Sequence, residues 1–245
     1  MDDVRVIEKI EQLVKDGLTV EVDGQEYSAA ELTPVVWEPT PDTVQVHNLR
    51  GFCGFINNDI DKAITARDHL IIVNSPGSVD LVSATKGKAM KRTQLVEAKI
   101  AEGLKQFQFG KFMSQKEFAI NFRSLFVKKD GDDFDYVLEY ASKLTAGTQI
   151  DGDDDGIAQR VTVKRGVSGH LSEKVKLKAI VKLSPYRTFR EVEQPESEFL
   201  LRVQNSGDVP NVALFEADGG AWINDATENI VGYIQSLVKE IPVIA

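Results

Sequence analysis

The stretch from residue 158 to residue 218 constrains the fold most, because its residues alternate in the way that β-strands require. Apolar side chains alternate with mostly basic side chains over residues 174–183, which gives ten residues of period 2. Such alternation is a strong strand signal, since successive side chains of a strand point to opposite faces. Strand composition is also found at residues 159–164, 198–204 and 211–215. We therefore predict a four-stranded sheet with one apolar face on a core and one basic face towards water.

Positive charge is concentrated in this predicted sheet, although the chain as a whole is acidic. The net charge of the chain is −9, whereas residues 158–190 hold nine basic residues and one acid. That segment therefore has a charge of +8, and the rest of the chain carries −17. A local basic surface on an acidic protein favours an anionic partner at that place. The residues that we assign to this predicted site are Arg160, Lys164, Lys174, Lys176, Lys178, Lys182, Arg187, Arg190 and Arg202.

Structural explanations compete with a binding role for these residues. Lysines on an edge strand deter edge-to-edge aggregation, which accounts for part of the pattern without a ligand. In the connection of residues 184–195, two aromatic residues alternate with Arg187 and Arg190, a combination suited to stacking on bases or gripping phosphates. The same connection is also typical of a packed corner in which the arginines pair with nearby acids. Those acids are Glu191, Glu193 and Glu196.

The remainder of the chain predicts helices and hairpins. Amphipathic spacing predicts helices at residues 3–16, 49–58, 134–144 and 225–240, and a further helix follows the capping box of Ser114 and Glu117. Hairpins are predicted around Asp23-Gly24 and around residues 74–77, and strands at residues 43–46 and 93–99. We expect the C-terminal helix to cover the apolar face of the predicted sheet with its inward-facing residues Ile230, Ile234, Leu237 and Ile241. That face consists of Val175, Leu177, Val181, Phe199 and Leu201.

Grouped rather than alternating strands and helices indicate an α+β fold. We expect a mainly antiparallel sheet in the C-terminal half, covered by helices, with a smaller mixed N-terminal part. Residues 1–150 would form a mixed region with two hairpins and a helix pair, and residues 151–245 the sheet with the C-terminal helix. The alternative is one continuous domain.

Catalytic and metal-binding motifs are not found in the sequence. The three histidines lack metal-ligand spacing and there is a single cysteine, Cys53, so we predict no metal, no cofactor and no enzymatic activity. Residues 151–156 match the first half of an EF-hand loop, but Thr162 stands where a bidentate glutamate is needed, and we predict no tight calcium site. One cysteine and the lack of a long apolar run favour a reducing cytoplasm and no membrane partner.

Four segments carry a resemblance to a protein family. They are residues 114–119, 154–159, 185–195 and 213–222. In these segments the chain resembles an uncharacterised YfdQ-like family encoded by tailed phages and prophages. The resemblance implies expression in the cytoplasm of a bacterial host and implies no reaction.

These observations lead to a ranked set of functional hypotheses. The first is a non-enzymatic phage accessory protein that binds nucleic acid or a nucleotide through the basic sheet face. The alternative is a protein–protein inhibitor of a host factor, which would serve host takeover or evasion of host defence. An enzyme with an unrecognised site ranks third. Both a host or phage protein partner and a homo-oligomer are compatible with the sequence.

Overall fold

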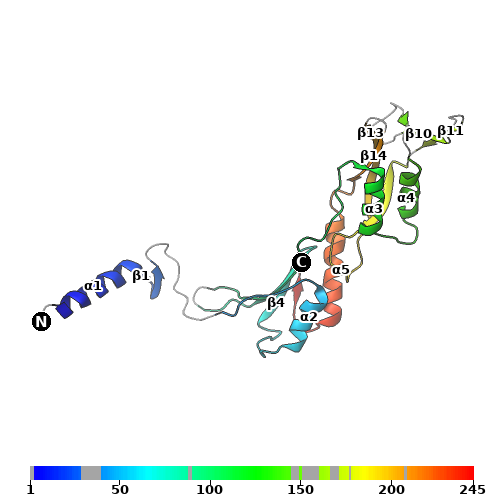
Figure 1. Cartoon of the computed structure of the whole chain (residues 1–245). Coiled ribbons are helices and arrows are strands. Elements are labelled where there is room, and N and C mark those ends of the chain that lie inside the picture. The colour runs from blue at the N-terminus through cyan, green and yellow to red at the C-terminus, as the bar shows by residue number, and fades with distance from the viewer. Residues whose placement is uncertain are drawn as a thin grey trace.

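The computed structural model describes residues 3–28, 40–87, 90–144, 149–150, 160–165, 171–176, 178–206 and 209–245. Over these residues the chain has an α+β fold, as predicted, in which helices accompany a five-stranded mixed sheet, a five-stranded antiparallel sheet and two smaller antiparallel sheets. The helices are α1 (Asp3–Leu18), α2 (Leu49–Asn58), α3 (Gln115–Leu125), α4 (Phe134–Lys143) and α5 (Trp222–Leu237). The molecule is elongated, with α1 at one end and the α3–α4 pair near the other (Figure 1).

The mixed sheet is formed mainly by the N-terminal part of the chain. Its strands are β3 (Val44–Val46), β4 (His69–Ser75), β5 (Ser78–Ser83), β6 (Gln94–Lys99) and β15 (Val243–Ile244), in the order β15-β4-β5-β6-β3. Strands β4, β5 and β6 are antiparallel, whereas β3 joins β6 and β15 joins β4 in parallel. The predicted hairpin around residues 74–77 is therefore confirmed as β4–β5. Apolar side chains of α2, α5 and the sheet form one buried cluster, which we call the N-terminal core.

The antiparallel sheet carries the alternation seen in the sequence. Its strands are β7 (Met113–Ser114), β8 (Phe126–Val127), β12 (Ile180–Pro185), β13 (Ser197–Ser206) and β14 (Val209–Glu216), in the order β7-β14-β13-β12-β8. Val181, Phe199 and Leu201 are buried on the predicted apolar face, and α3 and α4 cover them. Helix α3 begins at the predicted cap, where the Glu117 backbone N–H donates to Ser114 Oγ at 3.4 Å. We call this second cluster the C-terminal core.

Helix α5 does not pack where the sequence analysis placed it. Its inward residues Ile230 and Ile234 belong to the N-terminal core, together with Ile71 of β4. The predicted position, over Val181 and Phe199, is filled by α3 and α4. The prediction was wrong because an apolar stripe of suitable period fits any apolar sheet face, and the stripe itself does not select one. The two cores thus draw on residues from both sides of residue 150.

The predicted continuous strand over residues 174–183 is divided between two sheets, which corrects the four-stranded sheet. Its first part belongs to β11 (Leu171–Lys176), which pairs with β10 (Arg160–Arg165) and through it with β9 (Gln149–Ile150). Its last part is β12. Between them, the Lys178 backbone N–H donates to the Tyr136 hydroxyl of α4 at 2.8 Å instead of to a neighbouring strand. Because α4 occupies this position, the row of lysines along one strand is interrupted.

The N-terminal segment forms an arm of its own. Helix α1 leads into the hairpin of β1 (Thr19–Val22) and β2 (Gln25–Ser28). Asp23 and Gly24 have φ angles of +54° and +76°, as the predicted type I′ turn requires. Figure 1 shows α1 and β1 away from both five-stranded sheets. Among the described residues, no helix combines the length and the apolar character that crossing a membrane demands.

Candidate functional site

The hairpin β10–β11 brings together four of the nine predicted site residues. Its register pairs Arg160 with Lys176, Thr162 with Lys174, and Lys164 with Ser172. Directly paired residues of an antiparallel ladder lie on the same face, and every second residue of a strand returns to it. Arg160, Lys164, Lys174 and Lys176 therefore occupy positions on one face, which we call the hairpin face. No acid shares these positions, since Glu173 is opposite Val163 on the other face.

Lys178 and Lys182 lie apart from the hairpin face and face acidic partners. Lys178 Nζ donates to both carboxylate oxygens of Asp133 at 2.7 Å. Lys182 Nζ lies 3.8 Å from Glu196 Oε1, and the Lys182 backbone N–H donates to Asp133 Oδ2 at 2.8 Å. Asp133 thus fixes the N-terminus of α4 to the edge of β12. These two lysines are therefore partly neutralised within the protein.

The Arg187 side chain is 8% exposed and lies inside the protein rather than on its surface. Its Nη1 donates to Glu216 Oε1 at 2.6 Å, and its Nη2 donates to Ser197 Oγ. The guanidinium carbon lies 4.1 Å from the centre of the Trp222 ring, so the planar group stacks on the first residue of α5. Burial lowers the pKa of Arg187, and the neighbouring Glu216 carboxylate opposes that shift. Arg187 therefore links β13, β14 and α5 inside the protein.

The rest of the connection between β12 and β13 is a packed corner, one of the two interpretations that the sequence allowed. Phe189 is buried in the N-terminal core, and the Thr188 hydroxyl donates to the Pro76 carbonyl at 2.6 Å. Neither arginine of the corner pairs with the expected acids. Arg187 bonds to Glu216 instead. Arg190 is exposed and stacks on Tyr186, with 3.6 Å between its guanidinium carbon and the ring centre. The expected acids have other partners: Glu191 accepts from the Arg50 backbone N–H, Glu193 pairs with Lys129, and Glu196 lies near Lys182.

Arg202 lies at a third location, on β13. It is opposite Ala213 of β14 and is partly exposed, on the face away from the C-terminal core. The structure therefore distributes the nine predicted residues over the hairpin face, the β12 edge, the packed corner and β13. The hairpin face groups four of them by the register of its two strands. The acidic turn at residues 151–156, with its predicted lack of calcium binding, lies outside the described residues.

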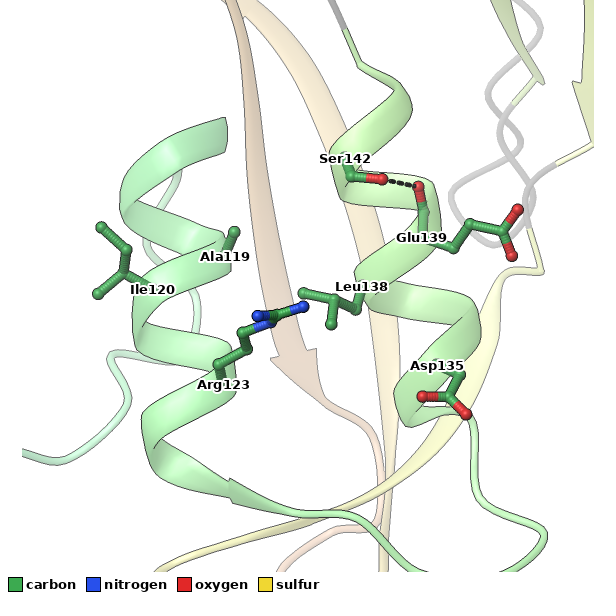
Figure 2. Close-up of a pocket in the computed structure, with 7 residues that line it drawn as sticks. All are labelled: Ala119, Ile120, Arg123, Asp135, Leu138, Glu139 and Ser142. Atoms are coloured by element: carbon green, nitrogen blue, oxygen red, sulfur yellow. Dashed lines mark hydrogen bonds between the residues drawn. The ribbon is translucent and has the colours of Figure 1, made fainter.

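A groove between α3 and α4 was not predicted from the sequence. It has a volume of about 560 Å³ and is lined by Ala119, Ile120, Arg123, Asp135, Leu138, Glu139 and Ser142 (Figure 2). The Arg123 side chain extends across it towards Leu138 (Figure 2). The acids at its rim are paired, Asp135 with Lys128 at 2.6 Å and Glu139 with Lys143.

The sequence contains one signal for this groove. Ile120 stands among the polar positions of α3 and is 68% exposed, although the helix buries its other large apolar residues. The groove offers apolar contact and a single cation, and its lining residues include no cysteine, histidine or tyrosine that could serve as nucleophile or base near neutral pH. The lining therefore combines apolar surface with one cation, two carboxylates and a serine hydroxyl.

Comparisons with known proteins assign no family to this chain. A scan of protein-family models, a search of curated proteins and a search of solved structures found no match to this chain. Within the described ranges, no group of three His, Cys, Asp or Glu side chains is arranged to hold a metal ion. The resemblance to the YfdQ-like family stays a prediction. The candidate site is therefore defined by its geometry and charge alone.

Proposed function

We propose that this chain is a non-enzymatic binding protein whose ligand is nucleic acid or a nucleotide, and that the hairpin face makes the contact. The register of β10 with β11 carries the proposal, because it places Arg160, Lys164, Lys174 and Lys176 on one face. Four basic residues at register positions that the hairpin's one acid, Glu173, does not share favour an anionic ligand on a chain whose net charge is −9. The resemblance to the phage family supports, as part of the same proposal, an accessory role in a bacterial host cytoplasm.

The size of the hairpin face sets the size of the expected contact. Residues two apart on a strand are roughly 6.6 Å apart, so Arg160 and Lys164 are separated by about 13 Å along β10. This length is half of the row that a continuous strand over residues 174–183 would have provided. The face therefore suits two or three phosphates of a nucleic-acid strand, rather than a long track.

The proposal is tested with two variants of equal charge change. The hairpin variant replaces three residues of the hairpin face by glutamine, namely Arg160, Lys174 and Lys176. The control variant replaces three exposed lysines from other parts of the surface by glutamine, namely Lys62, Lys116 and Lys239. Fluorescence anisotropy measures the affinity of each protein for a labelled single-stranded DNA oligonucleotide between ~50 and ~200 mM salt.

We expect the hairpin variant to bind more weakly and to lower the log–log salt slope by about two units, since each lost phosphate contact removes about 0.7 for single strands. The control variant should keep the wild-type slope. No measurable affinity of the wild-type protein at ~50 mM salt would refute a nucleic-acid ligand. Equal weakening of both variants would refute the hairpin face as the site, because the effect would then follow from net charge alone.

A further inference from the structure

The turn that joins β5 to β6 carries positive charge that the hairpin face does not include. Residues 84–93 hold four basic residues and no acid. Beyond the two strands the chain continues as a short ribbon, in which the Lys86 backbone N–H donates to the Lys91 carbonyl at 3.0 Å. Lys86, Lys91 and Arg92 are exposed on this ribbon. We call these three residues the basic turn.

Two cations of the basic turn face each other directly. Lys86 and Lys91 form an antiparallel bridge, so their side chains lie on one face, with roughly 5 Å between the two Cβ atoms. Like charges directly opposite each other destabilise such a pair. Among the described residues no acid forms an ion pair with the basic turn, and Arg92 Nη1 donates to the Ser83 carbonyl at 3.0 Å. An anion between the two lysines would therefore relieve a repulsion that the chain itself leaves uncompensated.

The shape of the basic turn indicates which kind of anion it suits. A nucleotide or another small anion binds in a concave site that covers most of its surface. Every residue from Thr85 to Arg92 that the structure describes is exposed, and Met90 near the tip is 67% exposed, so this turn projects into solvent. A two-stranded ribbon of this kind fits the major groove of B-form DNA, which is about 12 Å wide. Its cations then reach the phosphates that border the groove.

The composition of the turn favours double-stranded DNA over other nucleic acids. Sites for single strands stack the bases on aromatic side chains. Residues 84–93 contain no aromatic residue. The major groove of A-form RNA is too narrow for side chains to enter. A DNA duplex is therefore the nucleic acid that this segment can hold through charge alone.

The basic turn is remote from the hairpin face. It lies at the end of the mixed sheet where β4 begins, because the Ala84 backbone N–H donates to the Asp68 carbonyl at 2.6 Å. The opposite end of β4 and β5 contacts the packed corner, where the Thr188 hydroxyl donates to the Pro76 carbonyl. Figure 1 shows β4 well separated from β10 and β11. Contacts made at the basic turn therefore differ from those made at the hairpin face.

We propose that the basic turn is a second nucleic-acid contact, at which Lys86 and Lys91 hold phosphates of double-stranded DNA. The inference rests on the proposed function, because it assumes that the ligand of this protein is nucleic acid. It goes beyond that function by naming the duplex as the form of the ligand and by adding a site on the other sheet. Each phosphate held at this site releases condensed counterions, so salt dependence is the property that reports on it.

The test compares a turn variant with a matched control. The turn variant replaces Lys86 and Lys91 by glutamine, and the control replaces two exposed lysines elsewhere, Lys116 and Lys239, by glutamine. Fluorescence anisotropy measures each protein with a labelled DNA duplex of about 30 base pairs, and with one of its strands, between ~50 and ~200 mM salt. Circular dichroism should show that the turn variant folds as the wild type does, because its two replaced side chains are exposed and repel each other.

We expect the turn variant to lower the log–log salt slope for the duplex by about 1.8, at about 0.9 for each lost phosphate contact. Its slope for the single strand should stay at the wild-type value, and the matched control should keep both slopes. A duplex slope that the turn variant leaves unchanged would overturn the inference. An equal decrease in the matched control would do the same, because net charge alone would then explain it. So would binding of the wild-type protein to vesicles of anionic lipid that the turn variant loses.

These outcomes are separable from the test of the proposed function, which uses the hairpin variant and single-stranded DNA. If only the hairpin variant loses affinity, the hairpin face is supported and the basic turn is refuted. If only the turn variant loses duplex contacts, the basic turn is supported and the hairpin face is refuted. Wild-type protein without affinity for either form of DNA at ~50 mM salt would refute both.

Discussion

The packing of α5 on the N-terminal core makes a sharp prediction about two residues of the same helix. Ile234 is fully buried against the mixed sheet, whereas Leu237, three residues later, is 45% exposed. Both residues belong to the apolar stripe from which the sequence predicted the helix. Replacing each by alanine therefore separates the observed packing from the packing that the sequence suggested, in which Leu237 would be a core residue.

The magnitudes follow from what each substitution removes. Ile234→Ala deletes three buried carbon groups at about 0.8 kcal/mol each, and the enclosed cavity adds to this loss. We expect a decrease of about 2–5 kcal/mol in the free energy of unfolding. Leu237→Ala removes a side chain of which almost half is already in water, and it leaves no enclosed cavity. Its cost should be about 1 kcal/mol.

Guanidinium chloride unfolding measures both variants and is followed by circular dichroism and by Trp222 fluorescence. All proteins carry Trp37→Phe, which leaves Trp222 as the one tryptophan of the chain. Trp222 is a suitable probe because it begins α5 and stacks on Arg187. If the two cores unfold in separate transitions, Ile234→Ala should move the transition that loses the mixed sheet. A loss from Leu237→Ala as large as that from Ile234→Ala would show that α5 packs on another surface, and so would an unchanged midpoint for Ile234→Ala.

Two further predictions follow from buried polar groups. Arg187→Lys keeps the positive charge but loses the forked hydrogen bonds to Glu216 and Ser197 and the stacking on Trp222. The free energy of unfolding should therefore fall by about 2–3 kcal/mol, and Trp222 emission should shift to the red. Wild-type stability in that variant would contradict the buried link. Cys53 is 2% exposed, and burial raises the pKa of its thiol to about 11, so a disulfide reagent at pH 8 should label it only after denaturation. Stoichiometric labelling of the folded protein would place Cys53 outside the N-terminal core.

Local chemistry was predicted from the sequence wherever neighbouring residues decide it. Asp23-Gly24 predicted the type I′ turn of β1–β2, because few residues adopt two successive positive φ angles. Ser114 and Glu117 predicted the start of α3. The alternation of Val181 and Leu183 with Lys182 predicted which residues of β12 are buried. In each case the determining contacts lie within a few residues of each other.

The sequence predicted the candidate site only in part, because its residues lie on strands whose pairing the sequence pattern does not specify. The basic composition of residues 158–190 can be read from the sequence. It did not reveal that Asp133 engages Lys178 or that Glu216 engages Arg187, because these acids are remote in sequence. The residues of the hairpin face stay together because the local hairpin β10–β11 pairs Arg160 with Lys176.

The sequence by itself determined the faces of the strands and helices, the turns and the uneven charge, since period and local hydrogen bonding fix these. Only the tertiary structure decided which sheet each strand joins, which core α5 covers and which cations are neutralised. The physical reason is that periodicity specifies a buried face but not its neighbour. An apolar stripe such as that of Ile230 and Ile234 gains similar free energy on either sheet, so the choice rests on the shape of the surfaces and on the helices α3 and α4 that already occupy one of them.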